Sequence, residues 1–231
     1  MKAFHGDPAI KERYLARVRA HRAADELVRG QYWEDGKGCA VGCTIHSDDH
    51  GAYERELGIP REIAQLEDGI FEGLPNDLAI SWPEEFLAAI QVGADLSLVW
   101  PRFALWLLAD PDHGARRRAE DDTRAVSAID DVALLFAEWI GSGIRPEESR
   151  WAAARDAAGN AARDAANDAT WHATWHAAWA AGWAAAGDTR WAAARAAARA
   201  AAGAAGWIDW WIAARATLLE LLASAPVTAA T

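Results

Sequence analysis

Residues 32–50 contain most of the side chains that could do chemistry. Both cysteines of the chain, Cys39 and Cys43, lie in this segment and are followed by His46 and His50. On one helix these four side chains would fall within about 60° of one face, at about 100° per residue. Thiolates and imidazoles are ligands that tetrahedral Zn²⁺ accepts. The spacing therefore indicates a candidate zinc site, although glycines interrupt the segment and the spacing differs from that of the common zinc fingers.

The same segment also fits nucleophilic catalysis. A cysteine at a helix start, close to Lys37, would have a lowered pKa and would react as a thiolate. A nearby histidine would serve as the base, and an aspartate would orient that histidine. The candidate catalytic residues are Cys43, His46, His50 and Asp48, with Cys39 and Asp49 as alternatives.

A third interpretation is ligand binding at the glycines around Lys37. A Gly-rich turn can aim backbone N–H groups at an anion, but this one lacks the Gly-Lys-Ser/Thr ending of a P-loop. The candidate ligand-binding residues are Lys37, Gly38, Cys39, His172, Trp175 and His176. A purely structural alternative stays open, in which both cysteines are buried and inert in a tight turn.

Composition narrows the classes of protein to which the chain could belong. The 231 residues carry a net charge of −11, which argues against nucleic-acid binding, since such proteins normally show a basic footprint. No basic and apolar leader opens the sequence, and only two cysteines occur, so we expect a soluble cytoplasmic protein. Residues 1–145 form an acidic region, whereas residues 146–231 are rich in Ala and Trp. We predict these two regions as separate helical domains packed together as one unit.

Helical periodicity and helix-ending residues recur along the first region. Asp7 before Pro8 predicts a helix start, and Gly30 predicts its end. No run shows the alternation of a half-buried strand. Residues 30–46 are expected to be irregular. The predicted helices cover residues 7–30, 47–57, 60–73, 82–92, 95–108 and 114–140.

A four-residue repeat begins at Trp151, and it combines Trp, Gly or Arg with polar residues and alanine pairs. Alanine is the best helix former, so the repeat predicts helices. The tryptophans at 171, 175, 179 and 183 would span about 120° of a helix and form a ridge. We expect the ridge to serve packing, because a nucleic-acid platform would need neighbouring basic residues. A membrane span over residues 169–187 is disfavoured by its weakly apolar alanines and its two histidines.

Several segments of the sequence resemble those of a family of uncharacterised bacterial and phage proteins. The segments are GKGCAVGCTIHSDDH, ELGIP, LEDGIFEGLPN and GADLS, and an alanine-rich repeat follows them. The likeness covers most of residues 1–110. It implies an accessory protein that acts on host machinery, and it implies no activity or site residue.

These observations predict an all-α fold, a multi-helix bundle in which short helices pack with long Ala/Trp-rich helices. The high aromatic content without a complete catalytic signature favours a binding protein that recognises a host protein or a small ligand. The alternative is a Cys/His-dependent hydrolase or transferase, or a zinc-dependent enzyme, built on residues 39–50.

Overall fold

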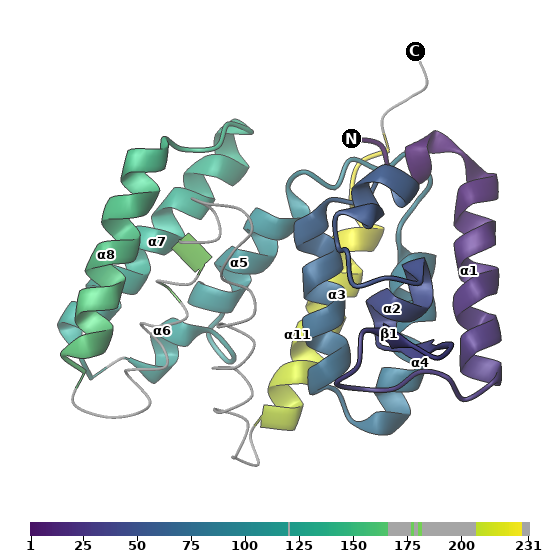
Figure 1. Cartoon of the computed structure of the whole chain (residues 1–231). Coiled ribbons are helices and arrows are strands. Elements are labelled where there is room, and N and C mark those ends of the chain that lie inside the picture. The colour runs from purple at the N-terminus through teal and green to yellow at the C-terminus, as the bar shows by residue number, and fades with distance from the viewer. Residues whose placement is uncertain (120, 166–176, 178–179, 182–206, 228–231) are drawn as a thin grey trace. The chain divides into compact units, whose positions relative to one another are not determined.

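The computed structural model describes residues 1–119, 121–165, 177, 180–181 and 207–227 (Figure 1). Over these residues the chain forms helices joined by loops, with one two-stranded antiparallel hairpin. The predicted all-α fold is confirmed. Among the described helices, none combines the length and hydropathy that a bilayer crossing requires. All four tryptophans of the predicted ridge, Trp175 among them, and the candidate ligand residues His172 and His176 lie outside the described residues.

Tertiary contacts divide the chain into two compact units. The first unit comprises residues 1–100 together with 205–231, and the second comprises residues 101–204. The predicted domain boundary between residues 145 and 146 lies where the amino-acid composition changes. The two units, by contrast, are defined by the contacts between residues. The C-terminal segment therefore belongs with the N-terminal one, although the two differ strongly in composition.

The first unit is built from helices around a core of large aromatic and aliphatic side chains, among which Trp82, Tyr14 and Tyr53 are fully buried. Its elements, in chain order, are η1 (Ala3–Gly6), α1 (Pro8–Ala23), β1 (Trp33–Glu34), β2 (Lys37–Gly38), α2 (Ala40–Ile45), η2 (Tyr53–Leu57), α3 (Arg61–Gly73), α4 (Asn76–Ala89) and α11 (Trp207–Ala223). In the hairpin, Trp33 pairs with Gly38 and Glu34 with Lys37.

Helix α1 begins as predicted, because the Asp7 carboxylate accepts a hydrogen bond from the backbone N–H of Ala9 at 2.8 Å. It ends at Ala23 rather than Gly30, and Asp25 then adopts a left-handed conformation with φ of 55°. Residues 30–46, expected to be irregular, instead contain the hairpin and α2.

The predicted helix over 60–73 is confirmed as α3, but other boundaries differ. Helix α4 begins at Asn76 and carries Trp82 and Pro83 inside it, so the predicted start at Trp82 is wrong. The Trp82 indole is buried and donates from Nε1 to the Glu67 carbonyl at 2.9 Å, which anchors this helix to α3. The predicted helix over 47–57 is reduced to η2, a single π-helical turn.

Helix α11 closes the first unit by packing on α3 and α4 (Figure 1). Its inward residues Ala214, Leu218 and Leu222 are fully buried. Beyond the helix, the backbone N–H of Asp95 donates to the Pro226 carbonyl at 2.8 Å. Residues at opposite ends of the sequence therefore complete one core.

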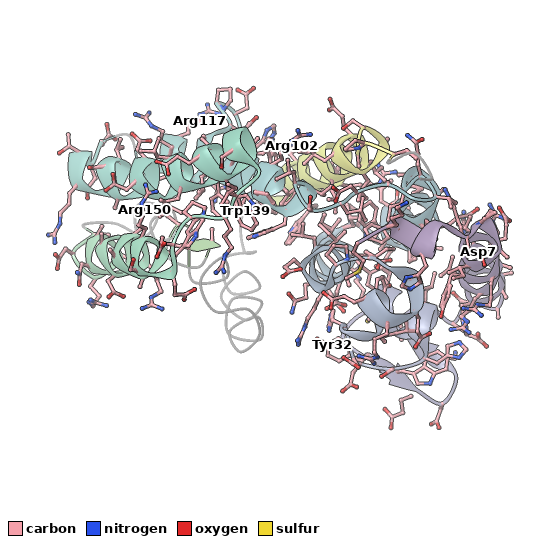
Figure 2. All side chains as sticks on the ribbon, turned by 90° about the horizontal axis from the view of Figure 1, so that it is seen from above. Asp7, Tyr32, Arg102, Arg117, Trp139 and Arg150 are labelled. Carbon is pink, nitrogen blue, oxygen red and sulfur yellow. The ribbon has the colours of Figure 1, made fainter. Side chains whose placement is uncertain are left out.

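The second unit contains α6 (Ala115–Arg118), α7 (Thr123–Ser142) and α8 (Glu148–Arg163), and it takes in most of α5 (Val99–Ala109), which begins in the first unit. Helices α7 and α8 lie side by side (Figure 1). In Figure 2 the label Trp139 marks α7 and the label Arg150 marks α8. Trp151 is fully buried between these helices, with its ring centroid 4.7 Å from that of Phe136. At this first position of the repeat, tryptophan therefore serves packing.

Candidate functional site

The glycines of the Cys/His segment allow two backbone stretches to touch. A Cβ atom on Gly38 would lie 2.0 Å from the Tyr32 carbonyl oxygen, and one on Gly42 would lie 1.4 Å from it. The Gly38 N–H donates to the Glu26 carbonyl at 3.1 Å, and the Cys39 N–H donates to the Gln31 carbonyl at 2.7 Å. These N–H groups therefore hold the loop of residues 24–36 in place.

The predicted anion site at Lys37, Gly38 and Cys39 must be corrected accordingly. The N–H groups of Gly38 and Cys39 are already bonded to carbonyl oxygens, so they cannot converge on an anion. Lys37 is exposed on β2. The glycines that suggested a cradle are needed for close packing instead.

Both cysteines are fully buried thiols. Cys39 immediately precedes α2, and Cys43 lies within that helix, where its Sγ donates to the Gly38 carbonyl at 3.3 Å. Burial raises the pKa of Cys39, and the nearby Asp68 carboxylate raises it further. Burial also raises the pKa of Cys43, to about 12. A thiol with such a pKa is not a thiolate at neutral pH, so this geometry argues against the predicted nucleophile.

Ellman's reagent should therefore react with neither cysteine in the native protein at neutral pH, and with both after unfolding in guanidinium. The reason is that the thiols are both protonated and shielded from solvent. Absorbance of the released thionitrobenzoate measures the stoichiometry. Single Cys39→Ser and Cys43→Ser variants assign each thiol, and stoichiometric labelling of either one in the folded state would contradict this placement.

The predicted zinc ligands do not converge. His46 follows α2 and contacts Trp33 and His21, whereas the ring of His50 lies against Tyr32 at a centroid distance of 5.7 Å. In the described part of the chain, no three His, Cys, Asp or Glu side chains are grouped so that they could hold a metal ion. The four-ligand site expected from a continuous helix over 39–50 is therefore not formed, because α2 ends at Ile45.

His50 belongs to a buried polar cluster instead. Its Nε2 lies 3.7 Å from a carboxylate oxygen of Asp68, which is fully buried on α3. The neighbouring Glu67 is also fully buried and accepts a hydrogen bond from the Tyr53 hydroxyl at 2.5 Å. Burial raises the pKa of Glu67 well above its ordinary value, and the Asp68 carboxylate adds to the rise. This cluster is shielded from solvent and supports the core.

His46 ends a chain of hydrogen bonds that starts at a carboxylate. The Nδ1 of His21, in the last turn of α1, lies 2.6 Å from a Glu26 oxygen. The Nε2 of His21 lies 2.9 Å from the Nε2 of His46. The His46 ring stacks on the Trp33 indole, with centroids 4.3 Å apart and planes 12° apart. Four side chains from α1, the following loop, β1 and the end of α2 therefore meet.

An open hollow of about 480 Å³ lies beside this chain of contacts. It is lined by Gln31, Tyr32, Trp33, Glu34, Ser47 and Asp48. Tyr32, which is labelled in Figure 2, also contacts His50 through its ring, so the hollow borders the buried cluster as well. We call this site the Trp33 hollow. Its aromatic side chains and carboxylates offer stacking, hydrogen bonding and negative charge to a ligand.

The Trp33 hollow contains part of what the sequence predicts. Asp48 lines it and His46 stacks against its wall, whereas Cys43 and His50 are buried away from solvent. Sequence reasoning missed His21 and Glu26, because both lie outside the Cys/His segment. It also gave Tyr32, Trp33 and Glu34 no role, although their aromatic and acidic types next to that segment were visible.

Comparison with protein-family models, with curated proteins and with solved structures finds no match for this chain. The resemblance to the bacterial and phage family therefore stays a prediction.

Proposed function

We propose that the protein is a binding protein, located in the cytoplasm, that recognises a protein partner through the Trp33 hollow. The family resemblance implies that the partner is a host protein. The single observation that carries the proposal is an open hollow that combines exposed carboxylates with half-buried aromatic rings. Such a combination suits a lysine or arginine side chain, which can place its cation against an aromatic face and beside a carboxylate.

The carboxylates of the hollow support this choice of ligand. Glu34 and Asp48 are exposed, and no ion pair in the described part of the chain involves either of them. By contrast, the neighbouring Asp49 is paired with Arg55 at 2.5 Å. Lys37 lies opposite Glu34 in the hairpin without an ion pair to it, so this carboxylate remains open to an incoming cation.

The enzyme alternative receives less support from the same geometry. Its nucleophile would be Cys43 or Cys39, and both thiols are buried and held protonated by a raised pKa. Its zinc site would need ligands that the structure keeps apart. Binding requires neither group, which makes it the function that the site supports better.

Titration calorimetry with a blocked tetra-arginine peptide tests the proposal. We expect binding at low salt, and we expect Trp33→Ala to weaken it roughly fivefold, which corresponds to about 1 kcal/mol of cation–π interaction at a partly exposed site. Asp48→Asn should weaken binding by a similar factor, because an exposed ion pair contributes up to about 1 kcal/mol.

Two controls accompany this measurement. A tetra-glutamate peptide should not bind, and Asp131→Asn, which removes an exposed charge from α7, should leave the affinity for tetra-arginine unchanged. Binding that all three variants retain at equal strength would show only general attraction by a negatively charged protein. That result, or no binding at all, would refute recognition of a cation by the hollow.

A further inference from the structure

The two imidazoles beside the Trp33 hollow face each other end-on. Their Nε2 atoms lie 2.9 Å apart, and their ring centroids are 5.1 Å apart with planes at 83°. The distance between the ring centroids exceeds the distance between the two Nε2 atoms by about two ring radii. Each Nε2 therefore lies close to the line that joins the two centroids and points at the other ring. This alignment is that of an N–H···N hydrogen bond, in which one ring donates and the other accepts.

The Glu26 carboxylate determines which ring donates when both are neutral. An ionised carboxylate only accepts, so the Nδ1 of His21 must carry the proton that lies between His21 and Glu26. The Nε2 of neutral His21 is then an acceptor, and the Nε2 of His46 is the donor. The lone pair of His46 therefore lies on Nδ1.

One added proton can enter this pair without breaking it. The proton binds at Nδ1 of His46, and the shared proton moves from Nε2 of His46 to Nε2 of His21. The positive charge then lies on His21 beside Glu26, and His46 remains neutral with an N–H on Nδ1 instead of a lone pair. A second proton would place two N–H groups and two charges against each other at this distance, so the hydrogen bond would be lost.

The charged groups around His46 come from several elements. Arg17 and His21 on α1 disfavour a charge on the His46 ring, whereas Glu26 and Glu56 favour it, and burial together with Arg17 and His21 lowers the pKa of His46. Arg17 is held in place by donating to the Thr44 carbonyl at 2.8 Å. The carboxylates of the hollow, Glu34 and Asp48, follow Trp33 by one residue and His46 by two residues in the sequence.

We infer that His21 and His46 take up one proton as a unit below neutral pH and thereby weaken the binding of a cation in the Trp33 hollow. The regulation rests on the proposed function. Uptake adds one positive charge beside the hollow and turns the exposed His46 from a hydrogen-bond acceptor at Nδ1 into a donor. The added charge opposes a lysine or arginine side chain, which is itself a cation, because the His21 ring that carries it contacts Trp33 of the hollow.

Nitrogen-15 chemical shifts of the imidazoles test the proton uptake directly. Between about pH 8 and about pH 5.5, we expect both rings to titrate together with one proton, and Nδ1 of His46 to change from a lone-pair shift to an N–H shift. His113, which bonds to a carboxylate of Asp110 and lies near Trp106, supplies reference imidazole signals in the same spectra. Separate full titrations of His21 and His46 would overturn the inference.

The coupling to binding is measured with the tetra-arginine peptide at about pH 7.5 and about pH 5.5 in the wild type and in the double variant His21→Gln/His46→Gln, which has neither imidazole. The wild type should lose at least about threefold more affinity on acidification than this double variant, because only the wild type has the two imidazoles that share the added proton. Equal losses with binding retained would overturn the regulation and leave the proposed function standing. Absence of binding at both pH values would overturn both, whatever the imidazole titration shows.

Discussion

Replacing Gly42 by alanine is expected to lower the free energy of unfolding of the first unit by about 3 kcal/mol or more. The added Cβ would lie 1.4 Å from the carbonyl oxygen of Tyr32, which is backbone and cannot rotate away. Either α2 or the loop at Tyr32 must move, and the hydrogen bonds of that loop to Gly38 and Cys39 would be strained or lost. Urea unfolding followed by far-ultraviolet circular dichroism measures the change.

Gly51→Ala is the matched control in the same unit. Its Cβ would meet the Asp49 carboxylate at 3.0 Å and the Arg55 guanidinium at 3.3 Å, both of which are ends of exposed side chains that can shift. We expect it to change the free energy of unfolding by less than about 1 kcal/mol. If Gly42→Ala unfolds at the same urea concentration as this control, the close contact between α2 and Tyr32 does not exist in solution.

Glu67→Gln is expected to flatten the pH dependence of stability. Because burial raises the pKa of Glu67 above 4.5 in the folded state, the folded protein keeps a proton that the unfolded chain releases. The stability contributed by this group is therefore complete below the unfolded-state pKa and is lost as pH rises toward the folded-state pKa, at up to about 1.4 kcal/mol per pH unit. Glutamine cannot ionise, and its amide can still bond to the Tyr53 hydroxyl.

Unfolding free energies at intervals from about pH 5 to about pH 8 check this expectation. The wild type should lose stability across that range more steeply than Glu67→Gln, and the two curves should be closest at the acidic end. Glu62→Gln removes the same charge from a half-exposed position of α3 and controls for the change in net charge. Parallel curves for the wild type and Glu67→Gln would mean that Glu67 is not buried as a protonated acid.

Local patterns predicted the helices well where a single face is apolar. Helix α3 is the clearest case, because Ile63, Leu66 and Ile70 repeat at helical spacing and all three are buried. Helix α4 shows the limit of this reasoning. Proline after Trp82 resembles a helix start, yet the bond from the Trp82 indole to α3 is a tertiary contact that local sequence cannot reveal.

The candidate site could be predicted only in part, for a similar reason. Asp48 and His46 were found because they lie close to the cysteines in sequence. His21 is 25 residues away from His46, and only the packing of α1 against α2 brings the two rings together. The glycines led to a wrong prediction, that of an anion site. They lack a side chain because the backbone there lies against Tyr32, and not because it approaches an anion.

The return of α11 to the first unit has a consequence for synthesis on the ribosome. Leu218 and Leu222 fill the core between α3 and α4, yet they are translated only after the whole of residues 101–204. The core of the first unit therefore remains incomplete until the intervening residues 101–204 have been synthesised. During that interval the apolar surface that α11 later covers is exposed and can be bound by a chaperone.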